Sequence, residues 1–469
     1  MVFSSPIFLL FFLPLVLVVY YNPLFRRRSF RNNVLLIFSL VFYAWGEPLF
    51  VFVMMLSILI NWFFVRVMDR QKDPLKRRIW MLVPIIFDVS LMFLFKYLGF
   101  FAHNLGILMG SPISIDIALP IGISFFTFQI MSYVLDVYRR NAPVQNNILR
   151  LGLYISLFPQ LIAGPIVRYE TVADEINERH ENREDFVQGM TRFIFGLGKK
   201  VLLANYVGLI ADNLFALGTL SVASAWLGVI AYALQIYYDF SGYSDMAIGM
   251  GRMFGFHFLE NFNFPYIARS VTDFWRRWHI SLSTWFRDYV YIPLGGNRVG
   301  SARHAFNLLV VWGLTGLWHG ANWTFIVWGL YYFVFLLLEK LIGPKHKQGI
   351  LSHVYTLLIV LVGWVIFRSE TIGGAINYLG YMFGVGASGL ADKAFFYYLV
   401  NGRWVLVAAL LCTIPIVQGL RKFLEIKIQS PGWLTAMGYG RTVMTAIIFV
   451  LSLLACVNST YNPFIYFNF

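Results

Sequence analysis

The sequence is short of charge and of cysteine. Only 13% of its 469 residues are charged, whereas a soluble domain averages about 25%, and 59% are hydrophobic. The mean hydropathy of +0.67 is typical of a polytopic membrane protein. The two cysteines, Cys412 and Cys456, lie in apolar stretches without a C-x-x-C spacing, which argues against a disulfide framework and a zinc site. We therefore expect an all-α polytopic membrane protein without a metal centre.

Acidic residues are too few to balance the basic ones, and the formal net charge is +14. The basic residues cluster in short segments between apolar runs, such as FRRRSFR at 25–31 and RQKDPLKRR at 70–78. Lysine and arginine in short loops mark the cytoplasmic ends of membrane helices, beside anionic headgroups. The expected contact is therefore membrane lipid and not nucleic acid.

The first residues, MVFSSPIFLLFFLPLVLVVYY, lack a basic leader region and a small-residue cleavage site. An uncleaved first span with its N-terminus outside the cytoplasm is expected. No repeat of 20–50 residues and no low-complexity linker divides the chain, so a single integral-membrane domain over 1–469 is predicted. A span needs about 20 apolar residues, which gives about 11–13 membrane segments, including re-entrant or broken helices. The candidate segments lie near 6–22, 33–46, 49–67, 79–99, 117–137, 150–167, 187–215, 223–250, 305–338, 353–368, 374–386, 400–420 and 442–459.

The segment 262–304 departs from this pattern because it combines six arginines with many aromatic residues. It is too polar to span lipid and too aromatic for a plain loop. Interfacial helices have this composition, with Trp and Tyr at headgroup depth and Arg toward water or phosphate. Between the spans, YETVADEINERHENRED at 169–185 is the main acidic segment, where Thr171 and Asp174 resemble a capping box. A surface amphipathic helix without chemistry is predicted there.

The run 305–338 is too long for one span. As a single helix it would be about 51 Å long, against a hydrocarbon core of about 30 Å. Basic residues flank both ends, so we expect both flanks to be cytoplasmic and the run to turn back; these residues are Arg298, Arg303, Lys340, Lys345 and Lys347. Two half-length helices would then meet near HGAN, with Gly316 and Gly320 in the bend and His319 near mid-depth. Tags after residues 300 and 345 that report opposite sides would contradict this topology.

His319, in GLWHGANW, is the leading candidate for chemistry. Ionisable groups in membrane segments are costly and usually mark functional sites, and histidine is the commonest general base. The alternative is a packed histidine that is hydrogen-bonded to backbone carbonyls. A second histidine, His279, lies 40 positions earlier in FWRRWHISLSTW.

Neither G-x-S-x-G nor H-E-x-x-H occurs in the sequence. A histidine without its own nucleophile suits direct acyl transfer, in which it takes a proton from an attacking hydroxyl. Arg276 and Arg277 are candidates to hold a phosphorylated donor. Tryptophans at the same motifs could wall the pocket or simply pack, and one carboxylate lies at a nearby span. The further candidate substrate-binding residues are Trp275, Trp278, Trp318, Asn322 and Asp245.

At these residues the sequence resembles the membrane-bound O-acyltransferase family, in particular the bacterial branch that O-acetylates exported polysaccharides such as alginate. The matching stretches include LPIGISFFTFQIMSYVLDVYR, YYDFSGYSDMAIGMG, ENFNFPYIARSVTDFWRRWHISLSTWFRDYVYIPLGGNR, GLWHGANWTFIVWG and GWVIFRSE. The resemblance implies a multi-pass fold around a central funnel or tunnel, a catalytic core at 262–338 and additional spans at 350–469. The family's essential histidine falls on His319 and its second signature position on His279.

The resemblance further implies a cytoplasmic thioester donor, with acetyl-CoA expected, in a bacterial inner membrane. A periplasmic acetyltransferase partner would then modify the polymer. Whether His319 acts as a base or carries the acyl group is left open. Within the family, D-alanyl transfer to teichoic acid and acetylation of peptidoglycan or cellulose remain alternatives. Outside it, a transporter or flippase is the rival, and such a protein should show half-helix repeats with paired intramembrane charges.

Overall fold

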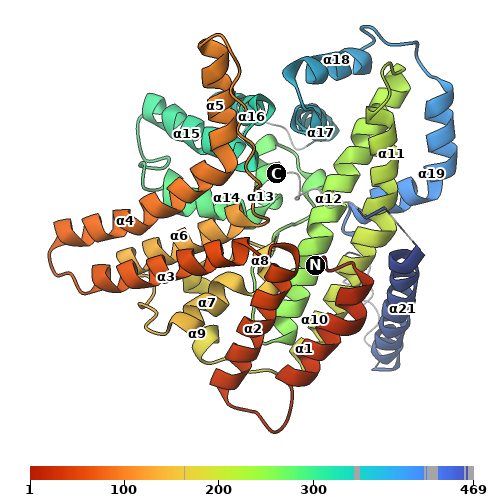
Figure 1. Cartoon of the computed structure of the whole chain (residues 1–469). Helices are drawn as coiled ribbons and strands as arrows, with labels where there is room; N and C mark the ends of the chain where they lie inside the picture. The colour runs from red at the N-terminus through yellow and green to blue at the C-terminus, as the bar shows by residue number, and fades with distance from the viewer. Residues whose placement is uncertain (163, 343–348, 417–418, 420–430, 459–460, 463–469) are drawn as a thin grey trace. The chain divides into compact units, whose positions relative to one another are not determined.

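The computed structural model describes residues 1–162, 164–342, 349–416, 419, 431–458 and 461–462 (Figure 1). Within these residues every regular element is helical, which confirms the all-α prediction. The chain packs into two compact units, residues 1–193 with 246–259 and residues 194–245 with 260–469. Lys345 and Lys347 of the predicted basic flank lie outside the described residues.

The first unit begins with a π-helical turn and continues as α-helices. Its elements are η1 (Phe8–Phe12), α1 (Leu13–Tyr20), α2 (Arg28–Gly46), α3 (Phe50–Asp69), α4 (Pro74–Met92), η2 (Phe93–Tyr97), α5 (Leu98–Leu108), α6 (Ile123–Arg139), α7 (Ile148–Ser156), α8 (Phe158–Leu161), α9 (Tyr169–Asn177) and the first part of α10 (Arg183–Gly198). Helices α3 and α4 run side by side (Figure 1). Both Ser57 and Asn61 donate to Asp88 Oδ1 at 3.0 Å, and such polar contacts stabilise the packing of apolar helices that lipid alone would not drive together.

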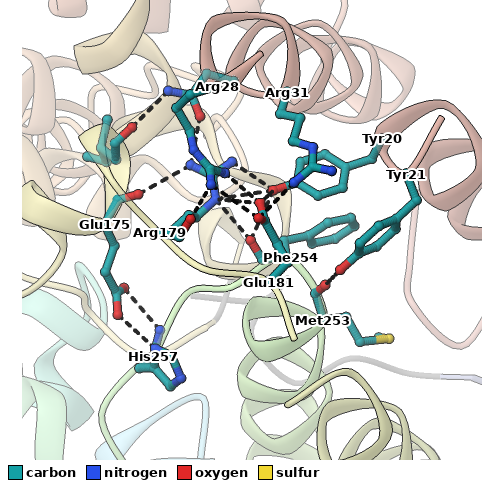
Figure 2. Close-up of polar contacts among 12 residues, drawn as sticks. Tyr20, Tyr21, Arg28, Arg31, Glu175, Arg179, Glu181, Met253, Phe254 and His257 are labelled. Carbon is teal, nitrogen blue, oxygen red and sulfur yellow. Dashed lines mark hydrogen bonds and ion pairs between the residues drawn. The ribbon is translucent and has the colours of Figure 1, made fainter. Parts of the chain in front are cut away.

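Figure 2 shows a polar cluster in the first unit, which we name the Glu181 cluster: Tyr20, Arg28, Arg31, Arg179 and Glu181. The Glu181 carboxylate accepts hydrogen bonds from Arg28, from Tyr20 and, at 2.7 Å, from Arg31. Arg179 is buried and donates from Nε to the Phe254 carbonyl at 2.9 Å, which satisfies a carbonyl just after α12. Burial opposes the charge of Glu181, but the hydrogen bonds from Arg28 and Tyr20 outweigh it and lower its pKa to about 2.

The second unit contains the remaining helices. They are η3 (Lys199–Ala204), α11 (Asn205–Phe215), α12 (Val222–Met253), η4 (Pro265–Ile267), α13 (Val271–Arg277), α14 (Ile280–Phe286), η5 (Arg287–Tyr291), α15 (Ser301–His319), α16 (Trp323–Ile342), α17 (Ile350–Arg368), α18 (Ile372–Met382), α19 (Lys393–Cys412) and α21 (Pro431–Asn458). The ends of α10 and α12 fall at the division between the units, so each helix contributes residues to both. Two buried side chains join η3 to α12, where Lys200 Nζ lies 2.6 Å from Asp239 Oδ1.

Seven helices among the described residues are long and apolar enough to cross a membrane. They cover Phe50–Asp69, Pro74–Leu108, Arg183–Phe215, Trp323–Ile342, Ile350–Arg368, Lys393–Cys412 and Thr435–Asn458. The segment Phe8–Tyr20 is a shorter apolar helix. These helices fit the polytopic architecture that composition predicts.

The apolar run 305–338 turns back, as predicted, and forms the antiparallel pair α15 and α16. The expectation of two half-length helices is wrong, because α15 has 19 residues and α16 has 20, which is enough for α16 to cross a membrane alone. Helix length therefore gives no reason to place His319 at mid-depth. Gly316 permits the close approach of the pair, since a Cβ there would lie 2.4 Å from the Phe325 carbonyl oxygen.

The segment 262–304 was predicted to form interfacial helices, and it contains the short helices α13 and α14, followed by the π-helical η5. Trp275, Trp278 and Trp285 are 9%, 3% and 3% exposed, so these rings pack inside the unit and do not lie at its surface.

The capping box predicted at Thr171 and Asp174 is wrong, because α9 begins at Tyr169. A side chain distant in sequence caps this helix instead: Asp136 Oδ2 accepts from the Glu170 N–H at 3.1 Å. Val172 and Ile176 are buried, so α9 is amphipathic as predicted and packs one face into the first unit.

Candidate active site

His319 is the last residue of α15 and is 5% exposed. Three aromatic rings surround its imidazole, with centroids at 5.0 Å for Trp318, 5.1 Å for Trp328 and 5.1 Å for Phe367. The helix ends there because the chain turns at Gly320, where a Cβ would lie 2.2 Å from the Phe325 ring. The local sequence thus holds an imidazole at a helix end inside a largely aromatic pocket.

His279 joins α13 to α14 and is 1% exposed. Its φ of 46° and ψ of 54° are left-handed, a conformation that costs a non-glycine residue about 1–3 kcal/mol and is enriched at functional sites. Nδ1 lies 3.1 Å from Asn261 Oδ1, and the Phe240 ring packs edge-on at 4.6 Å. Burial lowers the pKa of His279 to about 3, so the ring is neutral at neutral pH.

Trp318 brings the two predicted histidines into one site. Its indole lies 5.9 Å from the His279 ring and 5.0 Å from the His319 ring, between ring centroids. The two histidines are 40 positions apart in the sequence, but both lie beside the same indole ring. The turn between α13 and α14 and the C-terminal end of α15 thus form one site, which we name the histidine site: His279, Trp318 and His319.

The other predicted tryptophans belong to the aromatic wall around this site. Trp275 packs edge-on against Trp328 at 5.5 Å, and Trp328 contacts His319. Trp278 packs at 4.9 Å against Trp364, which in turn contacts Phe367. All of these rings are buried, so the wall keeps the imidazoles away from bulk solvent.

A cavity of about 920 Å³ adjoins the wall within the second unit. Its polar lining includes Asp212, Gln235, Asn322 and Arg368, and Arg368 pairs with Asp212 at 2.6 Å. Phe367 both lines this cavity and contacts His319. Of the predicted substrate-binding residues, Asn322 therefore lies at the cavity.

The remaining predicted residues lie in other settings. Arg276 is exposed at the C-terminal end of α13, whereas Arg277 Nε pairs with Asp273 at 2.9 Å. Asp245 pairs with Lys199 at 2.6 Å. Among the described residues, no group of three or more His, Cys, Asp or Glu side chains is arranged to hold a metal ion.

Sequence reasoning missed the polar residues that support His279. Asn261, Ser244 and Ser281 are each at most 2% exposed and form one hydrogen-bonded group with the imidazole. The available signal was the pair of asparagines in the aromatic stretch ENFNFPY at 260–266, a few residues before α13. Nothing in the local pattern showed that Asn261 would contact a histidine 18 positions later.

Comparison with known proteins places the chain in a family. The sequence model of the membrane-bound O-acyltransferase family matches residues 139–348, which include both histidines. The chain is 39% identical to a protein of Pseudomonas putida named "Probable alginate O-acetylase AlgI", with all of both chains covered. It is 31% identical to the peptidoglycan O-acetyltransferase of Helicobacter pylori, over 100% of this chain and 98% of that protein. It is 29% identical to the teichoic acid D-alanyltransferase of Bacillus subtilis, over 53% and 69%. This chain is a multi-pass membrane protein and an O-acyltransferase that belongs to the membrane-bound O-acyltransferase family.

Proposed function

We propose that the protein takes an acetyl group from a cytoplasmic thioester, acetyl-CoA, and passes it across the bacterial inner membrane for O-acetylation of an exported polysaccharide. The observation that carries this proposal is the full-length similarity to an alginate O-acetylase, together with two histidines on one indole. A periplasmic acetyltransferase is the proposed partner that completes transfer to the polymer. Alginate is the favoured polymer because of the same relative.

His319 is the proposed reactive group. The acceptor oxygen attacks the thioester carbonyl while His319 takes the hydroxyl proton; the carbon–sulfur bond then breaks and the leaving thiolate receives the proton. A positive charge on His319 would lie at the C-terminal end of α15, and the C-terminal end of a helix stabilises positive charge. The aromatic wall excludes water that would otherwise hydrolyse the thioester.

Two roles fit this position. His319 either acts as a general base or forms a transient acetyl-imidazole that the acceptor then attacks. Rapid quenching of a reaction with labelled acetyl-CoA distinguishes them, because only the second role leaves label on the protein at His319.

The cavity lined by Asn322 and Arg368 is the proposed approach for one of the substrates. It reaches Phe367, one ring away from His319. Arg276, exposed at the end of α13, is the proposed contact for the donor phosphates, because guanidinium groups form charge-assisted bonds to phosphate.

Transfer of radiolabel tests the proposal. Native membrane vesicles that contain the protein are given labelled acetyl-CoA, and label in the polysaccharide fraction is measured against vesicles that contain His319→Ala. Label in the first sample and none in the second supports the proposal. Equal label in both would refute the role of His319, and no label in either would refute the donor or the acceptor.

Transfer of D-alanine to teichoic acid is the second candidate, because the chain is similar to a teichoic acid D-alanyltransferase over about half its length. The relatives matched over the full length are acetyltransferases, which favours acetyl transfer. A D-alanyl thioester on a carrier protein, supplied in place of acetyl-CoA, separates the two. A transporter would transfer label from neither donor.

A further inference from the structure

The orientation of the Asn261 side chain is determined by its hydrogen bonds. The backbone N–H of Ser281 lies 3.2 Å from Oδ1, and a backbone N–H can only donate, so this atom of the amide is the oxygen. The other end agrees, since Nδ2 donates to Ser244 Oγ at 3.0 Å. The amide oxygen therefore faces His279.

This orientation decides which nitrogen of His279 carries the proton. Nδ1 lies 3.1 Å from Asn261 Oδ1, and an amide oxygen only accepts hydrogen bonds. The single hydroxyl proton of Ser281 is donated to the same oxygen at 2.9 Å, while Ser281 Oγ is 3.4 Å from Nδ1. Nδ1 must therefore be the protonated nitrogen, because two facing lone pairs would repel each other. In the neutral ring, Nε2 is then the acceptor.

Nε2 has no hydrogen-bond partner among the described residues. This is unusual because the His279 side chain is buried, with only 1% of the residue exposed. Leaving a buried acceptor unsatisfied is costly, and such groups in native proteins often have a purpose. The backbone adds to this cost, since His279 is held in a left-handed conformation. Asn261 stabilises this conformation of the backbone, because its backbone carbonyl accepts a hydrogen bond from the Ile280 N–H at 2.9 Å.

We propose that Asn261 is a positioning residue that holds His279 with its proton on Nδ1, so that Nε2 accepts a hydrogen bond from an N–H or O–H group of a bound substrate. This proposal rests on the proposed acyl transfer. The reacting hydroxyl proton goes to His319, so His279 holds a second group and orients the reactants. The two sources of such a group are the amides in the arm of the thioester donor and the hydroxyls of the acceptor.

The first test needs no substrate. The purified full-length protein is labelled with ¹⁵N-histidine, and the His279 signals are assigned by their loss in His279→Gln. The proposal expects a protonated Nδ1 and an unprotonated Nε2 in the wild type, and a change of tautomer in Asn261→Leu. Asn261→Asp keeps an acceptor oxygen and should keep the tautomer. A proton on Nε2 in the wild type would overturn the proposal.

The second test measures kcat and KM for labelled acetyl-CoA in native membrane vesicles. Asn261→Leu should lower kcat/KM on the order of 10–100-fold, the effect of losing one well-placed hydrogen bond to the substrate, and Asn261→Asp should recover most of it. A loss expressed as a raised KM identifies the donor amide as the group held by Nε2, whereas a loss in kcat alone identifies the acceptor. Wild-type kinetics in Asn261→Leu would overturn the proposal.

Asn307→Leu is the matched control. Asn307 is also a buried asparagine, and it donates to the carbonyls of Leu294 and Gly296 at 3.3 and 3.1 Å. Its loss should lower stability as Asn261→Leu does and leave the His279 signals unchanged. A tautomer change in this control would overturn the specific role of Asn261. If wild-type vesicles transfer no label, the proposed function has failed, while the nitrogen signals still decide the role of Asn261.

Discussion

The Glu181 cluster in the first unit and the histidine site in the second differ in how their buried polar groups are paired. Both oxygens of the Glu181 carboxylate accept hydrogen bonds from arginines, which stabilises the folded unit. In the histidine site the surroundings are largely aromatic, and Nε2 of His279 has no partner among the described residues. Buried charges are stable only when they are paired, whereas a buried acceptor that is left open is available to a substrate. The two regions thus differ in one respect: both oxygens of the Glu181 carboxylate are paired, whereas one imidazole nitrogen of His279 has no partner among the described residues.

His319→Ala should cause the largest loss. Removal of a general base costs about 10²–10⁴ in rate, so acetylation of the polymer should become undetectable. The small side chain leaves the α15–α16 contact intact, so the variant should insert and fold as the wild type does. Acetyl content of the polymer and a thermal melt in detergent check both parts, and normal acetylation would contradict the role given to His319.

Glu181→Gln should cause the largest loss of stability. Removal of the charge leaves Arg28, Arg31 and the buried Arg179 without their counter-ion, which costs about 3 kcal/mol in the free energy of unfolding. Acetyl transfer per folded molecule should remain, because Glu181 is no part of the histidine site. The control is Glu178→Gln, at an exposed carboxylate three positions earlier. Equal melting temperatures of the two variants would contradict the role of Glu181 as a stabilising counter-ion.

The Glu181 cluster should also respond to acid. The pKa of Glu181 is lowered from 4.5 to about 2 in the folded protein, so its stabilising effect is complete above pH 4.5 and is lost as the pH falls toward 2. Melting temperatures measured between pH 6 and pH 3 should fall less steeply in Glu181→Gln than in the wild type. Parallel curves would show that Glu181 does not contribute to this pH dependence.

Gly316→Ala should destabilise the helix pair that carries His319. The added Cβ would lie 2.4 Å from a backbone oxygen of α16, and such overpacking costs about 1–3 kcal/mol. Gly313→Ala, three residues earlier on α15, meets no atom within 4 Å and should be neutral or stabilising. Thermal melts of the two variants provide the comparison, and equal effects would argue against a close α15–α16 contact.

Arg276→Glu should have the smallest effect. If Arg276 contacts the donor phosphates, the reversal removes a charge-assisted bond and should raise the KM for acetyl-CoA about 10-fold without changing kcat. Arg403→Glu makes the same charge change at an exposed position on α19. A KM that is equal in both variants would remove Arg276 from the donor site.

The sequence predicted the features that depend on local composition. Apolar run length predicted the helices and the turn at HGAN, and the rarity of histidine in apolar segments singled out His319. The half-length helices were wrong, because the run continues helically beyond the range 305–338 at both ends. The prediction that His319 lies at mid-depth depended on these half-length helices and is therefore no longer supported by helix length.

Features that depend on distant contacts could not be predicted in this way. Asp136 caps α9 from another helix, and Glu181 pairs with arginines about 150 positions away. Asn261 meets His279 only because a left-handed turn brings α14 back to the stretch before α13. None of these contacts leaves a periodic signal in the sequence, since each joins residues that are at least 18 positions apart.

A double-mutant cycle on the two histidines tests the central claim most directly. The quantities to measure are kcat/KM for labelled acetyl-CoA in the wild type, His279→Ala, His319→Ala and the double variant, at equal amounts of folded protein. If the histidines work as one site around Trp318, the double variant should be no slower than the slower single variant. Losses that multiply would contradict a single site, and wild-type rates in His319→Ala would contradict the site altogether.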